Sequence, residues 1–276
     1  MAAKFAFLAC FQCFFSAFLS AQTDLLQTQL VYQIDKKTNT FAVDKLGFLY
    51  TSFGGTVQKY DAQGKLIYTF NENNLGKIAH LDAYNPLGIL AFYPDYWKGV
   101  VLDRTLSELS RFDLSAQAEG GILQAVALSS DNNIWVYNPN HFAIQKINAA
   151  GKVVLESPNL GILLEADYLE PIYLTEQNNK LYLQDAEKGV WVFDAFANFI
   201  QKIPVVSPNP IQIQHNQLFY SAEKSYFLYD MLRMEFLKLQ FSEQVDIQNV
   251  QQFWIQSPYV WLKYSDKILC YQLLKE

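Results

Sequence analysis

A recurring pair of residues, spaced at a nearly constant interval, constrains the fold of this 276-residue chain more than any other feature. In each pair, a large apolar residue ends a hydrophobic run and is followed by Asp or by an amide. The pairs are Tyr60-Asp61, Leu102-Asp103, Ile147-Asn148, Phe193-Asp194, Tyr229-Asp230 and Tyr271-Gln272, and their second positions are 36 to 46 residues apart. A period of about 42 residues made only of short strands and turns is typical of β-propeller blades.

The clearest repeat predicts a blade of four antiparallel strands over residues 40–43, 48–52, 57–60 and 65–70. Gly64 in the last turn supplies the positive φ that such a hairpin needs. Asp61 begins this turn, where its side chain can accept a hydrogen bond from the backbone two residues further on. We therefore expect the recurrent Asp to be structural, with a role in binding as the alternative.

The end of the chain indicates how the ring closes. After Gln272 only 276 − 272 = 4 residues remain, so the last blade has no room for a fourth strand of its own. Residues 29–34 have strand character and no place in the first blade. The predicted fold is all-β: a six-bladed β-propeller over residues 22–276, with four-stranded antiparallel blades and an N-terminal strand that pairs with the last blade and closes the ring.

The first residues predict export. Lys4, an apolar run over 5–19 and Ser20-Ala21 are typical of a signal peptide over residues 1–21. The alternative is an uncleaved anchor, but the run is shorter than the roughly 20 residues that span a bilayer. After cleavage, Cys270 is the only cysteine, so no internal disulfide can form. We expect a periplasmic or outer-membrane-associated protein with no direct membrane insertion.

Two segments carry a resemblance to a known group of proteins. They are Gly-Phe-Leu-Tyr … Val-Gln-Lys-Tyr-Asp-Ala-Gln-Gly-Lys at 47–65 and Asn-Ile-Trp-Val-Tyr … Ile-Gln-Lys-Ile-Asn-Ala-Ala-Gly-Lys at 133–152. The chain resembles six-bladed propellers of the NHL and TolB-like kind. A leader ending Leu-Ser-Ala-Gln and a Tyr-, Asn- and Gln-rich composition look like exported proteins of Bacteroidota. The resemblance implies a ligand binder, a lactonase-like hydrolase or a scaffold of an envelope complex.

The sequence predicts no catalytic motif, metal site or cofactor. His80, His141 and His215 stand at no metal-ligand spacing, and His80 and His215 fall at opposite ends of first strands. The resemblance to lactonase-like enzymes implies a channel metal near the starts of first strands, where this chain offers Asn39, Asp82, Glu170 and Asn209. Asp82 and Glu170 could form a carboxylate pair for acid–base chemistry. The alternative is that they are solvated channel groups.

One face of the ring is the predicted binding surface. In a propeller, the turns between second and third strands share a face with the connections between blades. The residues predicted to bind there are Tyr93, Asp95, Tyr96, Trp97, Tyr137, His141 and Tyr264. Tyr and Trp beside polar groups are typical of an interface or ligand site. The alternative is that the aromatic side chains of 93–97 fold back and plug the axial channel.

These observations favour a non-enzymatic propeller that acts as a protein-interaction module in a bacterial cell-envelope assembly, with an envelope protein as its partner. The alternatives are a small-ligand or glycan-binding propeller and a metal-dependent lactonase-like hydrolase. The net charge of −6 and the lack of any Lys/Arg-rich stretch argue against a nucleic-acid partner.

Overall fold

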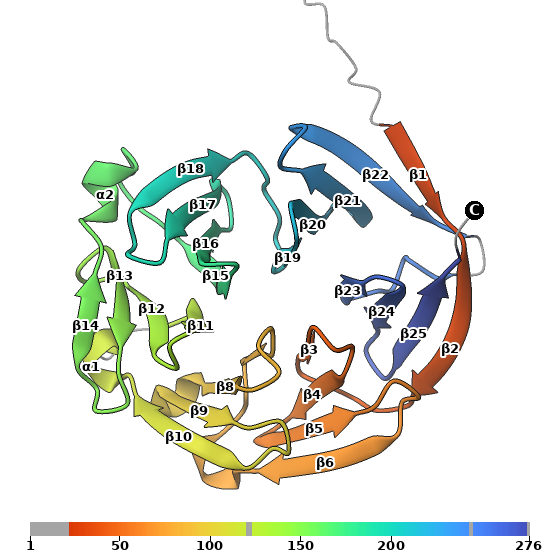
Figure 1. The fold of residues 1–276 in the computed structure, drawn as a ribbon, viewed down its shortest axis with the longest axis horizontal. Coiled ribbons are helices and arrows are strands. Elements are labelled where there is room, and N and C mark those ends of the chain that lie inside the picture. The colour runs from red at the N-terminus through yellow and green to blue at the C-terminus, as the bar shows by residue number, and fades with distance from the viewer. Residues whose placement is uncertain (1–21, 120–122, 243–244, 275–276) are drawn as a thin grey trace, which may run out of the picture.

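The computed structural model describes residues 22–119, 123–242 and 245–274. These residues form an all-β ring of six blades, each with four antiparallel strands (Figure 1). The predicted fold class is confirmed. The predicted signal peptide, residues 1–21, lies outside the described residues.

Within each blade the strands run outward from the axis in a meander. The first, innermost strands are β3 (Phe41–Val43), β7 (His80–Asp82), β11 (Val126–Leu128), β15 (Pro171–Gln177), β19 (Gln212–Gln214) and β23 (Gln252–Gln256). The second strands are β4 (Leu49–Phe53), β8 (Ile89–Tyr93), β12 (Ile134–Asn138), β16 (Lys180–Asp185), β20 (Gln217–Ala222) and β24 (Tyr259–Lys263). The third strands are β5 (Thr56–Tyr60), β9 (Lys98–Leu102), β13 (Ala143–Ile147), β17 (Gly189–Asp194), β21 (Ser225–Asp230) and β25 (Ile268–Leu273).

The outermost strands of blades 1 to 6 complete the ring. They are β6 (Leu66–Asn71), β10 (Glu108–Asp113), β14 (Val153–Glu156), β18 (Phe199–Ile203), β22 (Glu235–Phe241) and β2 (Thr28–Ile34). Short helical turns join some strands, namely η1 (Asn73–Leu75), η2 (Pro94–Tyr96), α1 (Ser115–Ala118) and α2 (Leu160–Leu163). Across the described part of the chain, no helix has the length and apolar character to cross a membrane.

The N-terminal segment closes the ring, as predicted. Strand β2 pairs antiparallel with β25 as the fourth strand of blade 6, with Thr28 opposite Leu273 and Ile34 opposite Ile268. Strand β1 (Gln22–Leu26) was not predicted: it pairs parallel with β22 and adds a fifth strand to blade 5. In Figure 1 the segment runs along the outer edges of both blades. It therefore holds blade 5 to blade 6 as well as closing blade 6.

The recurrent Asp is structural, as expected. Asp61 Oδ1 accepts hydrogen bonds from the backbone amides of Gln63 at 3.0 Å and Lys65 at 2.8 Å. The side chains of Asp103, Asn148, Asp194 and Asp230 accept backbone amides in the corresponding turns. Each bond fixes the tight turn from the third strand to the fourth. Blade 6 has no such turn, because its fourth strand comes from the other end of the chain.

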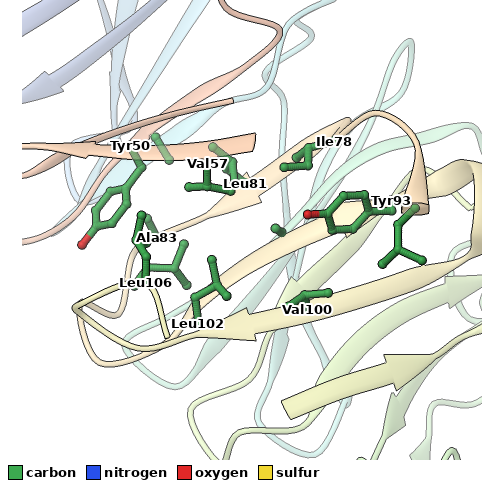
Figure 2. Packing of buried hydrophobic residues seen from close by; sticks show 13 residues of the cluster. Tyr50, Val57, Ile78, Leu81, Ala83, Tyr93, Val100, Leu102 and Leu106 are labelled. Carbon is green, nitrogen blue, oxygen red and sulfur yellow. The ribbon is translucent and has the colours of Figure 1, made fainter. Parts of the chain in front are cut away.

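The core consists of apolar layers between neighbouring blades. Six clusters of buried residues occur in the described structure, one at each contact between adjacent blades. Figure 2 shows the cluster between blades 1 and 2, in which Val57 of β5 and Leu102 of β9 pack together with Leu81 of β7. Middle strands such as β12 are buried along their whole length, because both faces contact another blade. Layered contacts of this kind stabilise the ring through the burial of apolar surface.

Candidate functional site

The strand order defines two faces of the ring. The face that we call the loop face carries the turns between second and third strands and the connections between blades. The opposite face carries the turns between first and second strands and between third and fourth strands. The predicted binding residues divide between the loop face and the core.

Three of the predicted tyrosines belong to the core. Tyr93 is fully buried, and its hydroxyl donates a hydrogen bond to the Gly55 carbonyl oxygen at 3.3 Å. Figure 2 shows the Tyr93 ring beside Ile78 and Val100, in the layer between blades 1 and 2. The prediction that Tyr93 forms part of an exposed surface is therefore corrected: its ring packs between two blades.

Tyr137 and Tyr264 are buried in the same manner. The Tyr137 ring lies edge-on to Phe142, with 6.1 Å between ring centroids, and burial together with the nearby Asp185 carboxylate raises its pKa to about 12. The Tyr264 hydroxyl donates to the Asp246 carbonyl oxygen at 2.8 Å. Both side chains are buried and contact neighbouring residues of the fold, so they do not form part of the exposed surface of the loop face.

The other four predicted residues lie in two turns of adjacent blades. Asp95 and Tyr96 are exposed in η2 of blade 2, and 53% of Tyr96 is accessible. Trp97 follows with φ +50° and packs against the cluster between blades 2 and 3. His141, in the β12–β13 turn, is half-exposed, with its Nδ1 3.2 Å from Glu156 Oε2. Trp97 thus folds back into an inter-blade layer and does not plug the channel.

Asp82 and Glu170 do not form the carboxylate pair that the sequence left open. Asp82 ends β7 toward the opposite face, whereas Glu170 precedes β15 at the loop face, where its amide donates to Asp185 Oδ2 at 2.6 Å. Asp82 instead lies with Glu176 in a cavity of ≈ 240 Å³ at the opposite face. Burial raises the pKa of Asp82 to about 6, and the charge of Glu176 adds to this effect.

Both of these carboxylates make structural hydrogen bonds. Asp82 accepts from the amides of Tyr84 at 3.2 Å and Leu128 at 3.0 Å. Glu176 accepts from the Ser129 hydroxyl at 2.7 Å, the Ser130 amide at 3.1 Å and the indole of Trp135. Burial raises the pKa of Glu176, but these bonds outweigh it and the net shift is downward.

The other predicted channel groups and the remaining histidine are dispersed. Asn39 is exposed and its Oδ1 accepts from the Gly54 amide at 2.8 Å. His215 lies exposed in the β19–β20 turn at the opposite face, away from His80 at the loop face, as predicted. Among residues 22–119, 123–242 and 245–274, no group of three or more His, Cys, Asp or Glu side chains could hold a metal ion.

A larger cavity opens at the axis on the loop face, with a volume of ≈ 280 Å³. Its walls come from first strands of blades 1, 2, 4, 5 and 6, from the connections that lead into blades 5 and 6, and from the β20–β21 hairpin. Asn209 Nδ2 donates to Ser221 Oγ at 2.9 Å in this wall. The ring of His80 lies edge-on to Tyr173, with 5.4 Å between centroids, and burial lowers the pKa of His80 to about 4. The sequence-based prediction named Asn209 as a channel residue but missed this cavity.

Comparison with solved structures relates the chain to other β-propellers. It is similar to the Pan2 WD40 domain of Neurospora crassa, with a TM-score of 0.58 and 10% identity over 93% of this chain and 98% of that chain. It is also similar to virginiamycin B lyase from Staphylococcus aureus, with a TM-score of 0.56 and 12% identity over 90% of this chain and 99% of that chain. The similarity to BamB from Moraxella catarrhalis has a TM-score of 0.51 and 10% identity over 89% of this chain and 100% of that chain.

These identities show a common fold and nothing finer. No protein-family model matches the sequence, and a search of curated proteins finds no significant relative.

Proposed function

We propose that this chain is an exported, non-enzymatic β-propeller that serves as a protein-interaction module in a bacterial cell-envelope assembly. The observation that carries the proposal is Tyr96, which is 53% exposed on the loop face. It sits in the short turn η2, between strands β8 and β9 of the ring. A tyrosine held by a rigid scaffold loses little conformational freedom when a partner covers it, and such residues are enriched among the strongest contacts of interfaces.

The surroundings of Tyr96 are consistent with an interface. Asp95 beside it is exposed, and His141 in the neighbouring blade is half-exposed. These polar groups can form the hydrogen-bonding rim that surrounds an aromatic anchor. The partner would be an envelope protein. Two resemblances support this choice: that of the repeats to NHL and TolB-like propellers, and that of the leader and composition to exported proteins of Bacteroidota.

The buried carboxylates favour this function over a lactonase-like hydrolase. An acid–base pair needs carboxylates whose oxygens face a substrate. Asp82 and Glu176 direct their oxygens to backbone amides, a hydroxyl and an indole of their own chain. Bonds of this kind hold turns at the opposite face and leave the two groups as parts of the scaffold.

Capture of the partner after crosslinking in intact cells tests the proposal. Tyr96→Ala should weaken capture roughly 30-fold, because the strongest interface residues contribute about 2 kcal/mol or more. Trp97 is left unchanged, since its ring belongs to a core layer. Lys65→Ala, in an exposed turn at the opposite face, is the matched control and should capture the partner as the wild type does. Equal capture by the Tyr96 and Lys65 variants would refute the proposed surface.

A further inference from the structure

The axial cavity on the loop face has walls without charge. Aromatic rings line it from several blades, including Tyr173 of β15 and Trp254 of β23. The only Asp, Glu, Lys or Arg residues that border it are Glu223 and Lys224, both exposed in the β20–β21 turn at the rim. His80 is neutral at physiological pH, because burial lowers its pKa to about 4. An ionic ligand would lose its hydration here without gaining an opposite charge in the wall.

Three side chains of this wall carry polar atoms that lack a partner. Among the described residues, Nε2 of His80, Oε1 of Gln252 and Nε1 of Trp254 are shielded from solvent and make no hydrogen bond. Buried polar atoms are nearly always paired, so unpaired ones need an explanation. Here they supply an acceptor from Gln252, a donor from Trp254 and, from His80, either role according to the tautomer.

Side-chain amides occupy two stretches of the backbone around the cavity. The side-chain amide of Gln212 binds the backbone of Ile255, accepting from its amide at 2.8 Å and donating to its carbonyl oxygen. The amide of Gln184 accepts from the Ile211 amide at 2.9 Å and donates to nearby backbone carbonyl oxygens. A peptide that binds as an added strand needs free backbone groups at such an edge. At these two stretches an added strand would find the backbone groups already bonded, so recognition there depends on side chains.

We propose that the axial cavity on the loop face binds a neutral, hydroxyl-rich ligand, namely a saccharide, through the rings of Trp254 and Tyr173 and the polar atoms of Gln252, Trp254 and His80. A hydroxyl group donates and accepts, so it can satisfy both the indole N–H and the amide oxygen. The rest of each side chain forms the cavity wall. Because the three polar atoms are shielded from solvent, binding requires each side chain to rotate until its polar atom faces the ligand. Apolar C–H faces of a sugar ring pack against aromatic rings without needing charge.

The size of the cavity limits the ligand to a short saccharide or to the end of a longer one. Its volume of ≈ 280 Å³ lies just below the range of about 300–1,000 Å³ that is typical of small-molecule pockets. The cavity opens at the loop face, so a longer glycan could continue outward past Glu223 and Lys224. This activity is separate from partner binding at Tyr96, which lies in the β8–β9 turn of blade 2.

Saturation-transfer NMR and tryptophan fluorescence test the site with defined probes. The probes are glucose, galactose, mannose, N-acetylglucosamine and the disaccharides maltose, cellobiose and chitobiose. We expect at least one to bind, with Trp254→Phe and the near-isosteric Gln252→Met each raising its Kd about tenfold or more, the loss expected when one hydrogen-bonding partner is removed. Two variants are used so that the test still stands if one of them misfolds. Each variant is first checked for an unchanged melting temperature.

Two comparisons decide the result. Tyr96→Ala should bind the sugar as the wild type does while losing its protein partner, so failure of the saccharide site and failure of the proposed interface are distinguishable. No binding of any probe up to about 10 mM would overturn the proposal. Sugar binding that Trp254→Phe and Gln252→Met leave unchanged would also overturn it, as would preferential binding of an acidic or basic peptide in this cavity.

Discussion

Tyr32 is the side chain through which ring closure can be measured most directly. It lies on β2, which comes from the N-terminus, and its hydroxyl accepts a hydrogen bond from Trp261 Nε1 on β24 at 2.7 Å. Trp261 is 1% exposed, so water cannot replace the lost partner. Tyr32→Phe keeps the ring that packs over Gly64 and removes only the hydroxyl. The substitution thus removes the hydrogen bonds that the Tyr32 hydroxyl makes across the closure, with Trp261 of β24 and with Cys270 of β25.

The expected loss of unfolding free energy is about 1–2 kcal/mol. Leaving a buried donor unpaired costs about 1–3 kcal/mol. Part of this cost is offset, because the Tyr32 hydroxyl is itself largely shielded from water, and this burial raises its pKa. Removing a desolvated hydroxyl restores some free energy to the folded state. The difference between the two effects places the net change in the lower part of the range.

Urea unfolding at equilibrium measures this difference. The midpoint should fall in Tyr32→Phe at unchanged slope, because the surface exposed on unfolding is the same. Tyr68→Phe is the matched control, because Tyr68 lies on the outermost strand of blade 1 and is 42% exposed. The unfolding free energy of this variant should stay within about 0.5 kcal/mol of that of the wild type. A Tyr32→Phe variant as stable as the Tyr68→Phe control would show that the hydrogen bonds of the Tyr32 hydroxyl do not stabilise the closure.

Three further predictions follow from the same structure. Deleting residues 22–35 should uncover β25 and cause aggregation, whereas deleting Gln22–Leu26 alone should leave a monomer. Light scattering measures the oligomeric state, and a longer deletion variant that stays monomeric with an unchanged melting temperature would contradict the closure. Asp194→Ala should cost about 1 kcal/mol, because the Asp194 carboxylate accepts the Phe196 and Asn198 amides, while Asp194→Asn keeps an acceptor and should cost less; equal losses in urea unfolding would refute the turn role. Between pH 4 and 6 the two shifted groups oppose each other: His80, with its pKa lowered from 6.5 to about 4, makes stability rise with pH, and Asp82, with its pKa raised from 3.8 to about 6, makes it fall. Each effect amounts to up to ~3 kcal/mol, so the two groups together should change wild-type stability little. The His80→Gln variant should lose stability as pH rises through this window, and the Asp82→Asn variant should gain it. Parallel pH profiles of the two variants would contradict the assignment.

The fold could be predicted because its determinants repeat along the chain. The Asp or Asn that begins each tight turn recurs at the blade period, and in blades 1 to 5 its side chain accepts the amide two residues further on. The shortage of residues after Gln272 also predicted the partner of β2. Strand β1 could not be predicted, because its parallel pairing with β22 uses backbone groups along an edge and leaves no periodic pattern of side chains.

The candidate site was harder to predict for a physical reason. Tyr93 ends a middle strand and Tyr264 directly follows one, and both faces of a middle strand contact a neighbouring blade. Such a tyrosine is buried whichever way it points, so its nearness to a loop in sequence says little about exposure. The axial cavity is formed by first strands such as β7 and β19, each three residues long. Strands this short give no periodicity from which to predict the residues that face the axis.

The closing strand and the axial cavity share part of the same apolar layer. Phe41 of blade 1 and Trp254 of blade 6 lie edge to face with 6.5 Å between ring centroids, and both side chains line the cavity. They also pack in the cluster that includes Ile34 and Tyr32 of β2. Residues of the closing strand and the Trp254 side chain at the cavity wall therefore belong to one packed cluster. Because closely packed side chains constrain one another, we expect loss of ring closure to disturb the cavity wall at Phe41 and Trp254.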